Sequence, residues 1–395
     1  GIIIKGLSFD LTKQIAGSRE VVKKLVTGVN FLVKKHKITL FKGEAKITGN
    51  NEITVNGAKG EIIATKNIII ATGARPRVLP GLEPDGKLIW TSKEAMLPDT
   101  MPKKLLVVGT GAIGVEFANY YAHLGCEVTM VEIADRILIA EDSEISTMAE
   151  KFFTEKGITI HKQTTVSTLK AGKSNVSASL KSIKTGKETE HKFDRVIMAV
   201  GVVGNTENIG LEHVGVKHEK NQIATNGYMQ TNINNIYAIG DVCGAPWLAH
   251  KASHEGVIAA DHIAGKSVTP MIKSNIPGCT YTSPQIASIG ITEDKAKEQK
   301  LNYKVGRFPF AANGKAIAMG EEQGLVKVIF DKATGELLGA HMIGAEVTEM
   351  IQGFAITKTV EATDVDLKHT IFPHPTLSEM MHEASLDSDD AAIHC

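Results

Sequence analysis

The feature that most constrains the fold is a glycine-rich turn, Gly109-x-Gly111-x-x-Gly114, which follows the apolar segment Leu105–Val108. The apolar segment predicts a buried strand, and the residues after the turn predict a helix. A second predicted strand follows this helix and ends at Glu132. This order of strand, glycine turn, helix and strand with a terminal acid is typical of a domain that binds a dinucleotide.

Each residue of the turn has a physical role in that hypothesis. Gly109 permits the tight turn, Gly111 lets the backbone approach a pyrophosphate, and Gly114 lets the helix pack closely on the strand. The helix N-terminus then stabilises the phosphate charge. Glu132 would accept hydrogen bonds from ribose hydroxyls and repel a 2′-phosphate, which favours NAD over NADP. Arg136 lies four residues further on, so NADP stays open, as does a glycine turn that serves packing alone.

A second nucleotide site is predicted where an apolar strand over residues 236–239 ends at Gly240-Asp241. The segment around it resembles the flavin-binding signature of flavoproteins with two dinucleotide-binding domains. This resemblance implies that the Asp241 carboxylate would hydrogen-bond a ribityl hydroxyl and that the following backbone would meet the flavin phosphates. A similar strand and glycine turn, IIIATGARP, lies upstream at residues 68–76. The order along the chain is therefore flavin part, dinucleotide domain and flavin part, which supports binding of FAD.

The rest of the sequence favours an α/β fold with several domains. A helical pattern covers residues 10–36, and a polar hairpin at residues 175–192 lies within an α/β region that continues to residue 200. Short strands are predicted at residues 38–40, 45–47, 53–55, 61–64, 326–330 and 337–343, and amphipathic helices at residues 348–360 and 377–384. We expect two dinucleotide-binding, Rossmann-like domains, the FAD one incomplete, and a C-terminal α+β interface domain.

Composition excludes several other classes of function. The chain of 395 residues carries 44 basic and 44 acidic side chains, so no overall field attracts nucleic acid or an anionic membrane. No run approaches the roughly 18 apolar residues that a membrane-spanning helix needs. The cysteines have no metal-like or redox-like spacing, which predicts free thiols, no metal site and a cytoplasmic location; they are Cys126, Cys243, Cys279 and Cys395.

The order of motifs ATGARP, GTGAIGVE, AVGxxxN, YAIGDV, LAHKASHEG and HPTLSE resembles the pyridine nucleotide-disulfide oxidoreductases over essentially the whole chain. LAHKA and Glu132 favour the dihydrolipoamide dehydrogenase branch. That resemblance implies oxidation of protein-bound dihydrolipoamide with reduction of NAD+ through FAD and a redox disulfide. It also implies a homodimer that serves the lipoyl domain of a 2-oxo acid dehydrogenase complex or of the glycine cleavage system.

The resemblance implies a division of the chain and a set of cofactor-binding residues. The division is a first part of the FAD domain (1–101), an NAD domain (102–206), a second part of the FAD domain (207–273) and an interface domain (274–395). The implied FAD contacts are Ala45, Thr72, Gly73, Asp241, Trp247, Leu248, Ala249 and His250. The implied NAD contacts are Gly109, Gly111, Gly114, Glu116, Glu132 and Gly201, with Glu116 also near the flavin.

The motif HPTLSE carries the acid–base chemistry that the resemblance implies. His374 would take the proton of a substrate thiol, and Glu379 would orient the imidazole and raise its basicity. Pro375 suits the first turn of a helix, which would leave His374 just outside that helix. In the family this pair serves the redox disulfide of the partner subunit.

Three departures from the family pattern are visible. Neither the first GxGxxG nor the CxxxxC pair of the flavin domain occurs, so a βαβ unit of ~30 residues or more is missing. We therefore expect this chain, if complete, to bind FAD weakly or not at all and not to turn over lipoamide. The segment Val202-Val203-Gly204 replaces the usual Arg-x-Pro, and His254 stands where an acidic residue is usual.

Other interpretations stay open. A related NAD(P)-dependent flavin disulfide reductase would share nearly every motif but act on another substrate. A flavoprotein without thiol chemistry, such as an NADH oxidase or a ferredoxin reductase-like enzyme, would have no use for HPTLSE. The third interpretation is not enzymatic: the chain would be an inactive fragment that binds NAD alone.

Overall fold

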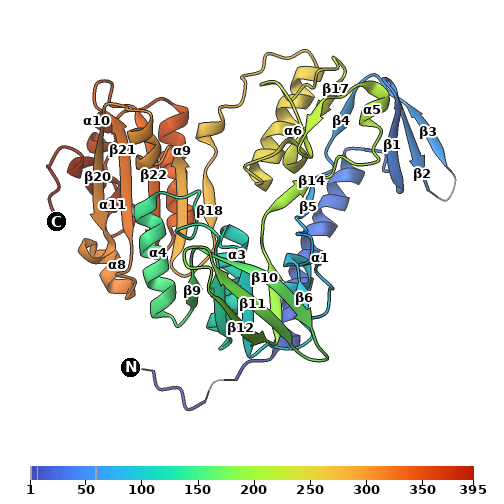
Figure 1. The fold of residues 1–395 in the computed structure, drawn as a ribbon. Helices are drawn as coiled ribbons and strands as arrows, with labels where there is room; N and C mark the ends of the chain where they lie inside the picture. Colours follow the sequence, from blue (N-terminus) through green and yellow to red (C-terminus); the bar gives the residue numbers. More distant parts are fainter. Residues whose placement is uncertain (1, 7, 58–59) are drawn as a thin grey trace. The chain divides into compact units, whose positions relative to one another are not determined.

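A computed structural model describes residues 2–6, 8–57 and 60–395. The chain divides into two units, one of residues 1–76, 93–101 and 202–271, the other of residues 77–92, 102–201 and 272–395. Both units combine helices and strands, as expected for an α/β protein (Figure 1). The finer four-part division expected from the sequence stays a prediction.

The first unit begins with the long helix α1 (Leu11–Lys35). The Asp10 carboxylate caps this helix by accepting a hydrogen bond from the Lys13 N–H at 3.0 Å, and Lys34 and Lys35 lie in its last turn, as the helix dipole favours. The predicted helix is confirmed. The strand expected at residues 38–40 is wrong, because these residues form a loop and three residues give too short an alternation to specify a strand.

Short sheets make up the rest of the first unit. The antiparallel sheet β1-β2-β3 comprises Glu44–Gly49, Glu52–Asn56 and Glu61–Ala64. The other elements are β5 (Ala74–Pro76), β14 (Val202–Gly204), α5 (Leu211–Val214), β15 (His218–Glu219), β16 (Gln222–Ile223), the 3-10 helix η1 (Gly240–Cys243) and α6 (Ala249–Ile263). The strands expected at residues 45–47, 53–55 and 61–64 are confirmed.

A parallel pair of strands positions the candidate flavin residues. Strands β4 (Ile68–Ile70) and β17 (Ile236–Ala238) are far apart in sequence but pair in register, so their carboxyl ends meet (Figure 1). Apolar side chains of both strands pack in one buried cluster with Val242 of η1. Burial of this cluster therefore fixes the position of the residues that follow each strand.

The second unit contains a five-stranded parallel sheet. Its strand order is β6 (Ile89–Trp90), β13 (Arg195–Met198), β7 (Lys104–Val108), β8 (Glu127–Val131) and β9 (Thr159–His161). Helices α3 (Ala112–His123) and α4 (Ser143–Glu155) connect the strands, and the antiparallel sheet β10-β11-β12 comprises Thr164–Ala171, Val176–Ser182 and Glu188–Phe193. Within helix α2 (Ser92–Ala95) the chain passes from the second unit back to the first. The predicted strand–turn–helix–strand order is thus confirmed.

The C-terminal part of the second unit is an antiparallel sheet covered by helices (Figure 1). The strand order is β18 (Gly278–Thr280), β19 (Gln285–Gly290), β22 (Leu337–Gly344), β21 (Leu325–Asp331) and β20 (Tyr303–Pro309). The helical elements are η2 (Lys273–Asn275), α7 (Glu293–Glu298), η3 (Phe310–Ala312), α8 (Gly314–Met319), α9 (Val347–Thr359), α10 (Asp364–His369) and α11 (Glu379–Asp387). None of the described helices is long and apolar enough to cross a membrane.

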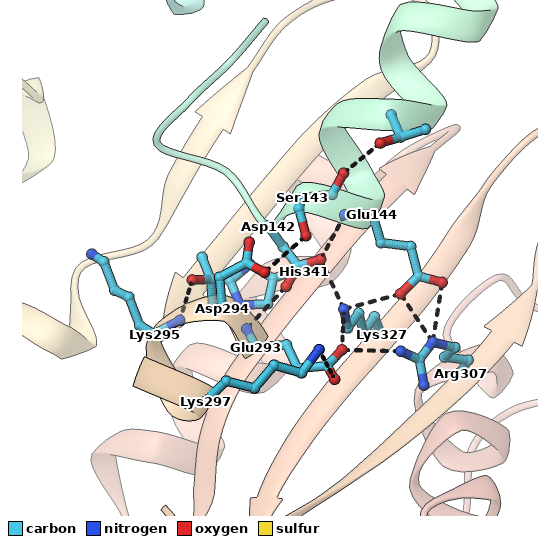
Figure 2. Close-up of polar contacts among 12 residues, drawn as sticks. Asp142, Ser143, Glu144, Glu293, Asp294, Lys295, Lys297, Arg307, Lys327 and His341 are labelled. Atoms are coloured by element: carbon cyan, nitrogen blue, oxygen red, sulfur yellow. Dashed lines mark hydrogen bonds and ion pairs between the residues drawn. The ribbon is translucent and has the colours of Figure 1, made fainter. Parts of the chain in front are cut away.

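A buried ion cluster joins the start of α4 to this antiparallel sheet. Lys327 of β21 lies within 2.8 Å of Asp142, 3.0 Å of Glu144 and 2.8 Å of Glu293, and Figure 2 shows its ammonium pointing at these carboxylates. Arg307 of β20 contacts Glu144 and Glu293, each at 3.0 Å. Burial acts to lower the pKa of Lys327, but the carboxylates outweigh it and raise the pKa above its usual value. The cluster is therefore held in its charged form.

Candidate cofactor and acid–base sites

The glycine turn has the packing role expected from the sequence. Gly109 follows β7 with φ +94, and a Cβ there would lie 2.4 Å from the carbonyl oxygen of Ala199. A Cβ on Gly114 would lie 2.0 Å from the carbonyl oxygen of Gly109. Both distances are too short for any side chain, so strand, turn and helix approach one another closely only with glycine at these positions.

Gly111 differs from the other two glycines because nothing lies within 4 Å of an added Cβ. It is the N-cap of α3, and no hydrogen bond from its own side chain is possible, so the first N–H groups of the helix are left without that kind of cap. The open space in front of a helix N-terminus suits a phosphate group, which the aligned peptide dipoles stabilise.

Glu132 lies at the end of β8 and faces the glycine turn. Its Oε2 accepts hydrogen bonds from the Thr110 N–H at 3.0 Å and the Thr110 hydroxyl at 2.5 Å, and its Oε1 accepts one from the Ala134 N–H at 2.9 Å. A carboxylate has roughly four acceptor positions, so these contacts leave room for a ribose hydroxyl. Sequence reasoning missed Thr110, because the residue between the first two glycines has no required type.

Gly201 and Glu116 lie near the same edge of the parallel sheet. Gly201 follows β13, which pairs with β7 so that Met198 lies opposite Val108, and its φ is +99. Glu116 of α3 accepts a hydrogen bond from the Tyr281 N–H at 2.8 Å. Burial raises the pKa of Glu116, and the Tyr281 hydrogen bond offsets this only in part. No sequence signal pointed to Tyr281, because it is 165 residues from Glu116 and the two meet only in the folded chain.

The residues expected near the flavin in the first unit form two groups. Asp241 lies in η1, directly after β17, and Gly240 before it has φ +75. Gly73 follows β4 with φ +71, and an added Cβ there would meet open space. The Thr72 hydroxyl donates to the Asn205 carbonyl at 2.7 Å, and the Thr72 carbonyl accepts a hydrogen bond from the Asn205 side-chain amide at 2.9 Å.

The remaining predicted flavin contacts lie at the start of α6 and in β1. Leu248 is the extended N-cap residue, Ala249 and His250 begin the helix, and Trp247 just before it is 41% exposed. Ala45 is an exposed residue of β1, opposite Val55 of β2. The N-cap residue Leu248 makes no side-chain capping hydrogen bond, and a helix N-terminus of this kind suits a phosphate group.

His374 and Glu379 meet as the sequence analysis expected. His374 Nδ1 lies 3.0 Å from Glu379 Oε1, and the imidazole is 78% exposed. Burial acts to raise the pKa of Glu379, but hydrogen bonds from Thr376 and His374 and the nearby histidine charges lower it overall. An ionised Glu379 holds the proton on Nδ1, which leaves Nε2 as the free base.

The expected place of Pro375 in a first helical turn is wrong. Helix α11 begins at Glu379, four residues later. The Glu379 carboxylate accepts the Thr376 N–H at 2.8 Å and the Thr376 hydroxyl donates to the Pro373 carbonyl at 2.7 Å. These side-chain contacts stabilise a separate turn before the helix, and this turn presents His374.

Family models match both parts of the chain. The one described as pyridine nucleotide-disulphide oxidoreductase covers residues 4–256, and the dimerisation domain of the same family covers residues 276–385. The chain belongs to the pyridine nucleotide-disulphide oxidoreductase family. It is thus an oxidoreductase of the flavoprotein disulfide class, whose dihydrolipoyl dehydrogenases use FAD and NAD.

The curated relatives lie within one branch of this family. A dihydrolipoyl dehydrogenase of Zymomonas mobilis is 52% identical over 389 residues, which cover 98% of this chain and 83% of that protein. One of Rhizobium etli is 52% identical over 406 residues, covering 98% of this chain and 84% of that protein. One of Bacillus subtilis is 42% identical, covering 100% and 85%.

Solved structures agree with the fold. LpdA of Mycobacterium tuberculosis is 26% identical and superposes with a TM-score of 0.89 over 96% of this chain and 84% of that chain. The HOCl-induced flavoprotein disulfide reductase RclA of Escherichia coli is 25% identical with a TM-score of 0.86, over 95% and 86%. The expected α/β architecture of this family is therefore confirmed.

The geometry fits both cofactors of the family. For NAD, the open space at Gly111 and the remaining acceptor capacity of Glu132 suit a diphosphate and an adenosine ribose. For FAD, two parallel strands end together beside Asp241 and Gly73. The individual roles of these residues are proposals.

Proposed function

We propose that this protein is a dihydrolipoyl dehydrogenase, which oxidises dihydrolipoamide and reduces NAD+ to NADH. The observation that carries the proposal is the contact of His374 Nδ1 with Glu379 Oε1 at 3.0 Å, in a chain that also has the dinucleotide turn. Thiol oxidation needs a base, since the reactive species is the thiolate. The high identity to several dihydrolipoyl dehydrogenases supports the same substrate class.

His374 is proposed to accept the proton of a substrate thiol at Nε2. A free thiol has a pKa of about 8.5, so near neutral pH most of it is protonated and needs such a base. Glu379 stabilises the imidazolium that forms, because its carboxylate is ionised and bound to Nδ1. The imidazole is 78% exposed in the single chain, so the side chains of its own subunit do not enclose it.

The other proposed residues bind and orient the cofactors. Gly111 and the N-terminus of α3 would hold the NAD diphosphate, and Glu132 would hold the adenosine ribose. Asp241 and the backbone at residues 247–250 would hold FAD. When bound, FAD supplies the two-electron chemistry that connects thiol oxidation to NAD+ reduction.

The proposed partners follow from the same assignment. Residues 276–385 match the dimerisation domain of the family, which supports the proposed homodimer. The family resemblance implies that His374 serves a redox disulfide of the partner subunit, and that CxxxxC pair does not occur among these 395 residues. The proposed substrate carrier is a lipoyl domain of a 2-oxo acid dehydrogenase complex or of the glycine cleavage system. We propose a cytoplasmic location, supported by four free cysteines, of which Cys126 is buried.

The test is turnover by the full-length protein. We expect NADH to form from NAD+ when dihydrolipoamide is added, and the purified protein to show the visible absorption band of flavin. A related disulfide reductase would ignore dihydrolipoamide and reduce another disulfide with NADH or NADPH. A protein that binds NADH but carries no flavin and turns over neither substrate would instead be an inactive NAD-binding form.

Substitution of Glu132 by glutamine tests the proposed nicotinamide specificity. Hydrogen bonds to a charged group are strong, so we expect the KM for NAD+ to rise about tenfold or more. Loss of the negative charge also removes repulsion of a 2′-phosphate, so the ratio of kcat/KM for NADP+ to that for NAD+ should increase. Steady-state kinetics with both nucleotides measure the two effects.

Glu127→Gln is the matched control, because Glu127 begins the same strand and pairs with Lys104 at the exposed surface, at 3.3 Å. This control should leave both kinetic constants unchanged. An unchanged nucleotide preference in Glu132→Gln would contradict the assignment of the ribose site.

A further inference from the structure

A buried ion pair in the first unit has no role in the chemistry described so far. Lys251 and Glu255 lie one turn apart on α6, with Nζ and Oε1 3.0 Å apart. Their side chains are only 1% and 4% exposed. An i, i+4 pair on a helix usually lies at the surface and contributes little, whereas desolvation of this pair costs free energy.

Both side chains of the pair form hydrogen bonds with the backbone of the turn that carries Asp241. The Gly240 N–H donates to Glu255 Oε2 at 2.6 Å. Lys251 Nζ donates to the carbonyl oxygen of Gly240 at 3.2 Å and to that of Gly244 at 3.3 Å. Buried peptide groups need partners, and here two charged side chains supply them at both ends of η1.

The two glycines explain why side chains are needed at this turn. Gly240 has φ +75 and Gly244 has φ +89, so neither continues the regular backbone of its neighbours. The Gly244 N–H donates to the Asp241 carbonyl at 3.0 Å, which closes the turn between them. Val242 is fully buried beside β4 and β17. The ion pair therefore fixes the backbone on both sides of Asp241.

The same pair connects this turn to the start of α6. Lys251 lies in the first turn of the helix, two residues after Ala249, and residues 247–250 are the second proposed flavin segment. A rigid link between the two segments sets the distance between the Asp241 backbone and the helix N-terminus. Affinity for a ligand that contacts both depends on that distance, since preorganisation removes ordering costs from binding.

We propose that Lys251 and Glu255 are positioning residues for FAD, which hold Asp241 and the N-terminus of α6 at the spacing that the bound flavin requires. This inference rests on the proposed function, because it takes Asp241 and residues 247–250 as flavin contacts. It assigns to the pair a contribution to flavin retention that exceeds its contribution to folding. The sequence signal is Lys-x-x-x-Glu within LAHKASHEG.

The experiment uses the full-length holoenzyme and the double variant Lys251→Met/Glu255→Leu, which removes both charges and leaves no buried ion unpaired. Loss of the hydrogen bonds at Gly240 and Gly244 should make release of FAD about tenfold to a hundredfold faster. Release is followed by the increase of flavin fluorescence on dilution. The free energy of unfolding of the flavin-free protein should also fall, because buried peptide groups at Gly240 and Gly244 lose their partners, but it should fall by less than the free energy of FAD binding does. Added FAD should restore turnover.

Two further variants complete the design. Lys266→Met/Asp261→Asn removes an exposed pair at the other end of α6, with side chains 65% and 36% exposed, and should release FAD at the parental rate. Glu255→Asp keeps the charge but shortens the reach to the Gly240 N–H. It should also release FAD faster, and it decides the question if the double variant does not fold.

The outcomes separate the two proposals. If the Glu255 variants that fold release FAD at the parental rate, the positioning role is wrong. It is also wrong if the control variant releases FAD as fast as they do. Neither result affects the proposed oxidation of dihydrolipoamide. If the free energy of unfolding of the flavin-free protein falls by as much as the free energy of FAD binding, the pair contributes to folding alone. A parent that holds no FAD and oxidises no dihydrolipoamide overturns the proposed function and this inference together.

Discussion

Replacement of His374 by glutamine is expected to slow dihydrolipoamide oxidation by about one hundred- to ten thousand-fold near neutral pH, the range for loss of a general base. Glutamine cannot accept the thiol proton, although its amide can still contact Glu379. Reduction of the bound flavin by NADH involves no substrate thiol and should keep its parental rate. Stopped-flow measurement of each half-reaction separates these two steps.

The pH dependence makes this prediction specific. Above a pH of about 8.5 the thiol ionises without help, so the deficit of His374→Gln should shrink as the pH rises through that value. His369→Gln is the control, because His369 is another exposed histidine, and its Nδ1 contacts the Val365 carbonyl of its own helix at 2.8 Å. A deficit that is constant with pH, or shared by the control, would contradict the role of His374 as base.

The parts of the fold and site that the sequence predicted are those that depend on local pattern. The strand expected to end at Glu132 is observed over residues 127–131, directly before that acid, because an apolar segment that ends at a charged residue is a local signal. The steric roles of Gly109 and Gly114 could also be predicted, since a glycine turn between strand and helix has few solutions. The contact of His374 with Glu379 spans only five residues.

The parts that were missed depend on contacts between distant segments. Lys251 and Glu255 have the spacing of an ordinary solvated helix pair, and only the turn at residues 240–244 makes them buried. Likewise Thr110 is 22 residues from Glu132 and Tyr281 is 165 residues from Glu116. Such pairs come together through tertiary packing, which periodicity in a single sequence does not report.

Lys327 illustrates the same point with the largest expected effect on stability. In sequence it is one residue of an apolar strand, yet its side chain is 1% exposed and lies 2.8 Å from Asp142, whose side chain is fully buried. Lys327→Met should lower the free energy of unfolding by about 3–5 kcal/mol, because it leaves buried carboxylates without their central cation. Urea unfolding followed by circular dichroism measures this loss.

Lys297→Met is the matched control for this substitution. Lys297 also contacts Glu293 at 2.8 Å, but its side chain is 60% exposed. Exposed ion pairs contribute little, so we expect the control to lose less than about 1 kcal/mol. Equal losses in the two variants would show that burial of the Lys327 charge has no special weight.

Acid titration gives an independent reading of the same cluster. Burial acts to raise the pKa of Glu293, but hydrogen bonds from Lys297 and Lys327 lower it from 4.5 to about 2. Because this pKa is lower in the folded state, the stability from ionised Glu293 is present above pH 4.5 and is lost as the pH falls towards about 2. Lys327→Met should weaken that dependence, so the stability gap between parent and variant should be widest near neutral pH and narrow below pH 4.5. A gap that stays constant across this range would mean that Lys327 stabilises the sheet through its packed methylene stem, and not through its charge.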